Sequence, residues 1–318
     1  MSSIDYSAFR KSRVLPSKLG ELSFDVLLSA YNDSARVQTV FAEVGAAAKH
    51  WLVHYEYGYP TAEHPHGAAV SGADEPAIDY LDRCIRQARL SPGMSLAVDI
   101  TGMMRPHLLV LPLLLRAAGL TNVSFLYSDP VGYSDGGATK FTKGPIEDVN
   151  VIPGLEGSHR VAVDAHDVLI IGAGYDHELV KAVAENKRLA DHYLMVGLPA
   201  LQPHMYQESV YRVSGASESI RDFRGRSLLF APANDPFVTA QVLSDHVGGL
   251  RAAGRADNLY LAPVGPKTQV LGFGWYFLCE ARRESASMIF PYASRYSRET
   301  SHGITGTSVF ELELDAML

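Results

Sequence analysis

Short apolar runs alternate with stretches of helical periodicity along most of this chain. The runs DVLLSAY (Asp25–Tyr31), SLAVDIT (Ser95–Thr101) and DVLIIGAG (Asp167–Gly174) are almost continuously apolar. Such runs are typical of strands that are buried on both faces of a sheet. Because helix-length segments separate them, the pattern predicts an α/β fold in which helices cover a parallel sheet.

The same order of elements occurs twice. Asp25–Leu28 matches Asp167–Ile170, and a second block matches Leu96–Gly102 with Leu259–Gly265. The second block has the larger offset, which requires an insertion in the second copy. Each copy runs strand, helix, strand, helix, strand, helix, strand. We therefore predict two tandem Rossmann-like parallel-sheet units, related by internal duplication and by a pseudo-two-fold axis.

The pattern also predicts where these parts begin and end. A polar arm precedes the first copy, and a segment rich in Gly, Ser and Asp separates the two copies. The predicted parts are an N-terminal arm at 1–20, a first copy at 21–135, a linker at 136–160, and a second copy at 161–318 whose insertion lies near 197–233. The sequence does not indicate a role for the insertion.

Composition restricts the class of protein. The chain has 28 Lys and Arg against 35 Asp and Glu, a net charge of −7, which argues against a general duplex-DNA binder because that class needs a broad basic surface. Cys84 and Cys279 lie in apolar, helix-like stretches and are expected to be buried free thiols. No apolar run approaches the ~20 residues of a membrane span. We expect a cytoplasmic protein that does not enter a membrane.

Ligands of open parallel sheets bind beyond the carboxyl ends of the strands. Four loops follow such ends here, two in each copy. The residues predicted to bind a ligand there are Tyr31, Asn32, Asp33 and Ser34; Thr101, Gly102 and Arg105; Gly174, Tyr175 and Asp176; and Gly265, Lys267 and Thr268. The dinucleotide-binding pattern is incomplete, since His177 stands where its third glycine would be, and no P-loop pattern occurs. We therefore expect no cofactor.

A basic residue follows the same strand in both copies. Arg105 comes after Thr101 and Gly102, and Lys267 comes after Gly265. A helix N-terminus presents free N–H groups and the positive end of a dipole, which favour an anion such as phosphate. A guanidinium or ammonium group adds a charge-assisted hydrogen bond. The alternative is a solvated cation at a helix start with no ligand.

Other candidate groups carry less chemistry. Tyr296 lies between Arg295 and Arg298, after the last Rossmann strand of the second copy and before a final strand predicted at Ser308–Leu314. Its ring would stack there on a base; the alternative is a plain surface loop. His64 and His66 are of metal-ligand type, but no further ligand is identifiable from the spacing, so we predict a polar loop and no metal site. No Gly-x-Ser-x-Gly elbow occurs. The sequence therefore identifies no catalytic residue.

The segment Asp99–Arg105 (DITGMMR) resembles the strand-four motif of the CARF superfamily, which is commonly a Thr-Gly-Gly-Thr-Lys run. Thr101 and Gly102 match, two methionines replace the next Gly and Thr, and Arg105 stands in place of the Lys. The first strand, the polar loop with Ser34 and the following helix are similar to the first ligand loop of that family. The resemblance implies Rossmann-like units that bind cyclic oligonucleotides across a two-fold axis. The related SAVED domain fuses two such units in one chain.

Three functions are compatible with these expectations. The favoured one, which rests on the resemblance, is a sensor that binds a small nucleotide, such as a cyclic oligonucleotide, in the cleft between the halves and signals to a separate effector protein in antiviral defence. The second is a ring nuclease, in which Lys267 or Arg105 would stabilise charge on the cleaved phosphate. The third is a structural or adaptor protein whose aromatic stretch Trp51–Tyr59 contacts a partner.

Overall fold

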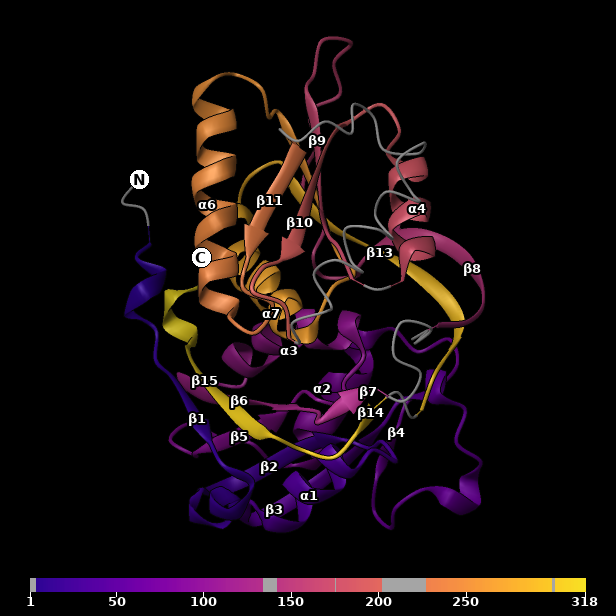
Figure 1. Cartoon of the computed structure of the whole chain (residues 1–318), viewed down its shortest axis with the longest axis vertical. Helices are drawn as coiled ribbons and strands as arrows, with labels where there is room; N and C mark the ends of the chain where they lie inside the picture. The colour runs from indigo at the N-terminus through magenta and orange to yellow at the C-terminus, as the bar shows by residue number, and fades with distance from the viewer. Residues whose placement is uncertain (1–3, 134–141, 175, 202–226, 299–300) are drawn as a thin grey trace. The chain divides into compact units, whose positions relative to one another are not determined.

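The computed structural model describes residues 4–133, 142–174, 176–201, 227–298 and 301–318. The chain forms two compact units, and Figure 1 colours them along the sequence. The first unit comprises Phe9–Lys143 and Arg295–Ala316, and the second comprises Met1–Ala8, Gly144–Ser294 and Met317–Leu318. Both are α/β units with mostly parallel sheets, which confirms the predicted fold class.

The sheet of the first unit has the strand order β1-β15-β6-β5-β2-β3-β4. Its strands are β1 (Lys11–Val14), β2 (Ser23–Ala30), β3 (Gly45–Val53), β4 (Ala69–Val70), β5 (Leu96–Asp99), β6 (Asn122–Asp129) and β15 (Gly306–Glu313). The strands from β6 to β4 are parallel, whereas β15 is antiparallel to β6 and β1 is antiparallel to β15. Every residue of β5 is buried, as its continuous apolar run predicts.

Helices α1 (Ala35–Glu43), α2 (Ala77–Gln87) and α3 (Arg105–Ala117) connect the parallel strands of the first unit. The sequence of α2 places its apolar residues on one face, and that face is buried. The buried residues of α2 are Tyr80, Leu81, Cys84 and Ile85. This spacing of one and four residues is that of an amphipathic surface helix, so burial of the apolar face holds α2 in place.

The sheet of the second unit has the strand order β11-β10-β9-β12-β13-β8. Its strands are β8 (Thr142–Val151), β9 (Asp167–Gly172), β10 (Asp191–Gly197), β11 (Leu228–Ala231), β12 (Asn258–Pro263) and β13 (Ala286–Tyr296). Its helices are α4 (His177–Asn186), α6 (Pro236–Ala252) and α7 (Lys267–Tyr276), which continues in a π-helical turn at Phe277–Ala281. Asp235 caps α6, because its carboxylate accepts hydrogen bonds from the N–H groups of Phe237 and Val238.

The parallel strands follow the same order in both units. The order β4-β3-β2-β5-β6 in the first unit corresponds to β11-β10-β9-β12-β13 in the second. The helices also correspond: α1 and α4, α2 and α6, and α3 and α7 connect equivalent strands of the two units, as internal duplication predicts. The strand order reverses between β2 and β5 and between β9 and β12. This topological switch point is where ligands of open parallel sheets bind.

The units do not follow the boundaries expected along the chain. Strand β15, which the pattern places in the second copy, pairs with β6 of the first unit, and β1, from the expected arm, pairs with β15. Within the expected linker, Thr142–Val151 forms β8 at the edge of the second sheet. Residues 134–141 and residues 202–226 of the insertion lie outside the described residues. Pairing between distant segments leaves no local sequence signature, so hydropathy alone could not assign these strands.

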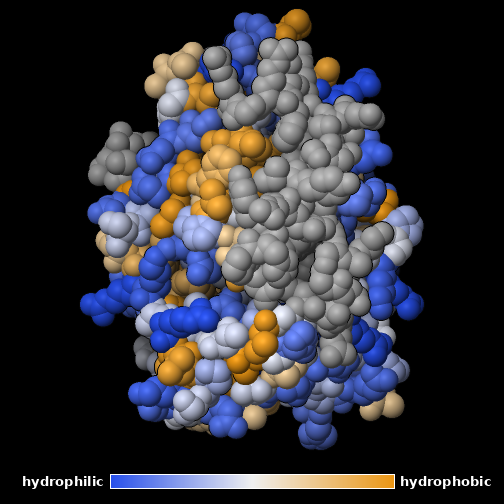
Figure 2. All heavy atoms as spheres, viewed as in Figure 1, coloured by the Kyte–Doolittle hydropathy of each residue, from blue (hydrophilic) through white to orange (hydrophobic). Residues whose placement is uncertain are grey.

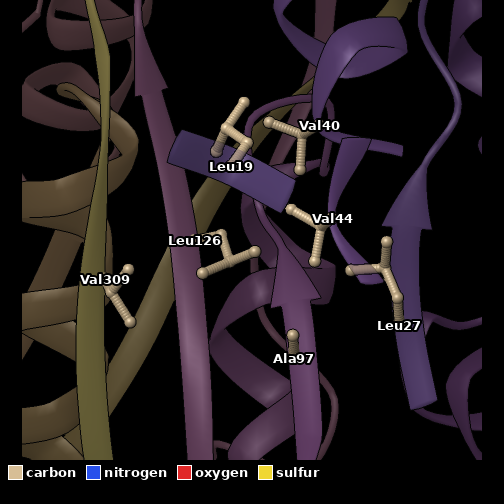
Figure 3. Close-up of a cluster of buried hydrophobic side chains, with 7 residues drawn as sticks. All are labelled: Leu19, Leu27, Val40, Val44, Ala97, Leu126 and Val309. Carbon is tan, nitrogen blue, oxygen red and sulfur yellow. The ribbon is translucent and has the colours of Figure 1, made fainter. Parts of the chain in front are cut away.

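An apolar cluster in the first unit joins these distant segments, and Figure 3 shows its side chains. Its members are Leu19, Leu27, Val40, Val44, Ala97, Leu126 and Val309. Six of them come from β2, β5, β6, β15, α1 and the 3-10 helix η2 (Pro16–Glu21), and Val44 directly follows α1. Burying a Val or Leu side chain contributes about 1.5–3 kcal/mol. Leu19 and Val309 therefore make the expected arm and the last strand part of the first unit's core.

The two cysteines are free and buried, as the sequence predicts. Burial raises the pKa of Cys84 to about 11, so its reactive thiolate form is scarce at neutral pH. Cys279 lies in the π-helical turn after α7. The structure therefore gives both thiols a packing role.

None of the helices within the described residues is long and apolar enough to cross a membrane. On the face drawn in Figure 2, hydrophilic side chains alternate with smaller hydrophobic areas over the coloured, described residues. Scattered apolar side chains of this kind are ordinary on a protein surface.

Candidate functional site

The two loops at the switch point of the first unit pass in close contact. A Cβ atom added to Gly102 would lie 2.2 Å from the carbonyl oxygen of Ala30 and 3.2 Å from the Cβ of Asn32. The loop after β5 therefore lies directly against the end of β2, and only glycine fits there. This close approach explains the glycine of the Thr-Gly pair without a ligand.

The second unit repeats this close approach. A Cβ on Gly265 would lie 3.2 Å from the carbonyl oxygen of Ala173, and a Cβ on Gly174 would lie 2.8 Å from that of Val264. Gly174 and Gly265 are both predicted to bind a ligand. Each of them therefore packs against the backbone of the loop that carries the other. The loops that sequence analysis singled out are brought together in each unit, and the glycines are what allow it.

Thr101 belongs to a buried polar network. Its hydroxyl accepts a hydrogen bond from the N–H of Ser128 at 3.0 Å, and its own N–H donates to the Asp99 carboxylate at 3.0 Å. That carboxylate also accepts from the hydroxyl of Ser29 at 2.9 Å. Thr101 is only 5% exposed. It therefore ties together the ends of β2, β5 and β6 and orients the loop that precedes α3.

Arg36, which the sequence analysis did not select, crosses the same edge of the sheet. It is the second residue of α1 and is 7% exposed. Its Nη1 donates to the carbonyl oxygen of Ser128 at 2.7 Å, so the side chain runs from α1 to the end of β6. Its Nε is buried and has no hydrogen-bond partner in the described part of the chain. Arg36 also forms no ion pair with any described residue.

Tyr57 is hydrogen-bonded to the loop that precedes α3. Its hydroxyl donates to the carbonyl oxygen of Gly102 at 2.8 Å. Burial raises the pKa of Tyr57, while the nearby positive charges of Arg105 and Arg36 act to lower it. The Tyr57 hydroxyl therefore fastens the loop that precedes α3 to the segment that follows β3.

A basic residue begins the equivalent helix of each unit, as the sequence predicts. Arg105 is the first residue of α3 and Lys267 is the first residue of α7, and both are half-buried. Neither helix has an acidic residue in its first turn. A cation at this end of a helix opposes the dipole unless an anion lies nearby. Thr268 has a structural role instead, since its buried hydroxyl donates to the carbonyl oxygen of Ala233.

The first loop of the first unit is held by its own side chains. The amide oxygen of Asn32 accepts from the N–H of Ser34 at 2.9 Å, and the N–H of Asp33 donates to the hydroxyl of Tyr59 at 3.1 Å. The ring of Tyr31 packs edge-on against Tyr59, with centroids 5.0 Å apart. These contacts fix the loop, and they leave Tyr31 half-buried and Asp33 exposed.

Tyr296 and Arg298, at the end of β13, do not form the exposed stacking site that the sequence predicts. Tyr296 is buried, 6% exposed, within β13, so its ring is not a surface for a base. Arg298 donates from Nε to the carbonyl oxygen of Tyr57 at 2.9 Å and from Nη1 to the Glu63 carboxylate at 3.0 Å. Its guanidinium also lies over the ring of Tyr59, 4.2 Å from the centroid. Arg298 therefore fastens the loop after β3 to the segment that follows β13.

In the second unit, the first loop leads into α4. Asp176, the residue before the helix, is 7% exposed, and Glu178 is in the first turn. Tyr175, also predicted to bind a ligand, lies outside the described residues. The second unit therefore presents acidic groups where α1 presents Arg36.

The described residues contain no group of three or more His, Cys, Asp or Glu side chains that could hold a metal ion. No model of a known protein family matches this chain, and no curated protein and no solved structure is significantly similar to it. The residues at the two sheet edges are therefore the features of this protein that indicate a function.

Proposed function

We propose that this protein is a sensor that binds an anionic nucleotide at the carboxyl ends of its parallel strands, as its resemblance to CARF and SAVED proteins implies. The observation that carries the proposal is the basic first residue of the equivalent helix in each unit, Arg105 in α3 and Lys267 in α7. Both positions follow a switch-point glycine, where a ligand of this fold class binds. A phosphate there would meet the positive end of a helix dipole and a cation.

Aromatic side chains of the first unit support a nucleotide over a simple inorganic anion. Tyr31 is half-buried beside the first loop and lies edge-on to Trp51 and Tyr59. Tyr59 is buried and Trp51 stacks on Phe41, so Tyr31 is the ring of this group that supports stacking on a base. A cyclic oligonucleotide is the ligand that the family resemblance favours, and its effector would be a separate protein in antiviral defence.

Two fully exposed valines lie on one loop of the second unit. Val161 and Val163 are 99% and 110% exposed. The loop that carries them is fixed at its ends: the Asn258 side chain bonds both the N–H and the carbonyl of Arg160, and the N–H of His166 donates to Asp257. Single exposed apolar side chains are ordinary on a protein surface, so these valines do not by themselves indicate a partner. The adaptor function therefore keeps the aromatic stretch Trp51–Tyr59 as its contact and follows the ring nuclease as the third candidate.

A thermal-shift panel with linear and cyclic nucleotides tests the proposal. Ligand at 100 times its dissociation constant adds about 2.7 kcal/mol to the free energy of unfolding. We expect one nucleotide to raise the melting temperature of the wild type but not of the Arg105→Ala, Lys267→Ala double variant. The matched control is Arg86→Ala, Lys181→Ala, which removes one exposed helical cation from each unit. A flat panel refutes nucleotide binding.

The same ligand distinguishes the sensor from the ring nuclease. The protein alone is incubated with the nucleotide that gives a thermal shift, and the products are separated by chromatography. A sensor returns the ligand unchanged. Linear products that disappear in the Arg105→Ala, Lys267→Ala variant would instead favour the ring nuclease.

A further inference from the structure

A buried serine holds one loop of the second unit at the amino ends of its parallel strands, the edge opposite the switch point. The loop links β8 to β9, and its residue His159 is half-buried. The Nε2 of His159 lies 2.7 Å from the hydroxyl oxygen of Ser287, the second residue of β13. The same oxygen accepts a hydrogen bond from the N–H of Gly157 at 2.8 Å. Ser287 is 1% exposed, so these contacts tie the loop to the interior of the unit.

The loop has further anchors on both sides of His159. On one side, the backbone packs so closely that a Cβ on Gly157 would lie 2.0 Å from the carbonyl oxygen of Ala286. On the other side, the Asn258 side chain bonds the N–H of Arg160 at 2.7 Å and its carbonyl oxygen at 2.9 Å. Backbone groups and the amide of Asn258 do not titrate near neutral pH. His159 is therefore the titratable side chain through which pH acts on this part of the loop.

The contact with Ser287 fixes which nitrogen of His159 carries the proton. Because the Ser287 oxygen already accepts from Gly157, its own hydroxyl proton is directed at Nε2, the other group in hydrogen-bond contact with it. Nε2 must then be unprotonated, and the neutral ring carries its proton on Nδ1. Nδ1 is buried and has no hydrogen-bond partner within the described ranges. The clasp, as we call the group Gly157, His159 and Ser287, thus fits the uncharged imidazole.

The surroundings of the ring also favour its uncharged form. The rings of His159 and Tyr260 are stacked, with centroids 4.4 Å apart, and the ammonium of Lys187 lies 4.0 Å from the centroid of Tyr260. Burial and the positive charge of Lys187 lower the pKa of His159 from its ordinary 6.5. Asn258 and Asp167 act on this pKa in the opposite direction and do not cancel the shift. The ring is therefore neutral at pH 7.

The other charged groups near the clasp have partners of their own. They are Glu156, Arg160, Asp164, His166 and Asp257, which bond to one another or to backbone N–H groups. His192 is a further histidine to consider, because its Nε2 lies 2.8 Å from the carbonyl oxygen of Lys187. A proton on His192 would act on the position of Lys187, and not on the contact between His159 and Ser287. The experiment must therefore separate the two histidines.

We infer that His159 makes this clasp acid-sensitive: a proton from solvent that binds Nε2 releases the loop from Ser287. The new N–H would point at an oxygen that already accepts from Gly157, and the hydroxyl proton of Ser287 would lose its acceptor. A buried donor without an acceptor is costly, and the charge on the ring is repelled by Lys187. When the loop opens, the ring regains its ordinary pKa, so protonation favours the open loop. The clasp is closed above pH 6.5 and opens progressively as the pH falls below that value.

Hydrogen exchange read by mass spectrometry tests the inference on the full chain. Protection factors for peptides that cover residues 155–162 are corrected for the intrinsic exchange rate at each pH between 7.5 and 4.5. In wild type we expect protection to fall about fivefold or more over this range. His159→Gln keeps a hydrogen-bonding atom near the position of Nε2 but takes up no proton, so its protection should change less than about twofold. The matched control His166→Gln, at the other end of the same loop, should keep the wild-type fall.

A titration of the His159 ring, followed by nuclear magnetic resonance, separates the clasp from a purely structural role. In wild type, protection should fall from pH 6.5 and level off at the pH where the ring titrates in the native protein. Ser287→Ala removes the hydroxyl that bonds the neutral ring, so it should raise the pKa of His159 towards 6.5 and weaken the pH dependence of protection. A pKa of His159 that Ser287→Ala leaves unchanged would overturn the inference.

The exchange experiment has its own contrary outcomes. Wild-type protection that does not depend on pH would overturn the inference, and so would a fall that persists in His159→Gln and is lost in His192→Gln. Equal loss of protection in the buried strand β12 would mean unfolding of the whole unit and would likewise overturn it. The inference goes beyond the proposed function, and none of these measurements involves a nucleotide. Failure of the clasp therefore leaves the proposed sensor untouched, and a flat nucleotide panel leaves the clasp untouched.

Discussion

Replacing Gly102 with alanine is expected to destabilise the first unit strongly. The added Cβ would lie 2.2 Å from the carbonyl oxygen of Ala30, about 1 Å inside an ordinary contact, so backbone must move in a close-packed region. Neither residue can move easily, because Ala30 is the last residue of β2 and Gly102 lies in the loop directly after β5. Overpacking of this kind costs about 2–4 kcal/mol.

The free energy of unfolding is measured by urea titration, with circular dichroism and tryptophan fluorescence as probes. Gly20→Ala is the control in the same unit, because its Cβ would meet only the carbonyl oxygen of Glu43 at an ordinary 3.7 Å; we expect it to be neutral or to stabilise by up to about 1 kcal/mol. Gly265→Ala, whose nearest contact is 3.1 Å, should cost about 1 kcal/mol. A Gly102→Ala protein as stable as Gly20→Ala would refute the packing explanation of the Thr-Gly pair.

Three further predictions concern stability and reactivity. Burial lowers the pKa of His107 from 6.5 to about 3, so the neutral ring stabilises the fold above pH 6.5 and this contribution is lost as the pH falls from 6.5 towards 3; urea titrations should show that wild type loses about 2 kcal/mol more than His107→Phe between pH 6.5 and 5, and parallel losses would contradict this. Because Cys84 is buried and its pKa is raised to about 11, iodoacetamide at pH 8 should label it in urea and not in the native protein, as mass spectrometry would report; rapid native labelling would show that the thiol is open to solvent. The Val161→Ser, Val163→Ser double variant should unfold within about 0.5 kcal/mol of wild type, since both side chains are fully exposed, and a larger loss in calorimetry would mean that these valines are packed in solution.

The local sequence pattern predicted most of the strands and helices that position the candidate site. The apolar runs gave β2, β5 and β9, and the repeated order of elements gave the equivalent helices. The basic residues Arg105 and Lys267 were expected near helix starts, and each is the first residue of its helix. These features depend on hydropathy period and on residues next to each other in the chain, which a sequence records directly.

Arg36 and Tyr57 could not be selected in the same way. Arg36 occupies a helical position that looks solvent-exposed from the sequence, and its burial results from the strands that surround it. Tyr57 ends the short 3-10 helix Tyr55–Tyr57, in a segment that has several aromatic residues and no period that distinguishes Tyr57 from them. A comparison of the two copies at equivalent helix positions provides one signal, the change from Arg36 to Glu178.

By itself, the sequence determined the class of fold, the duplication and the cations that begin α3 and α7. Only the tertiary structure decided that β1 and β15 complete the first sheet, that Arg298 fastens the loop after β3, and that the charge of Arg36 is buried at the switch point. The reason is the range of the interactions. Helix and strand periodicity is set by neighbours in the chain, whereas strand pairing and the burial of a charge are set by segments that lie far apart in sequence and meet only in the folded protein.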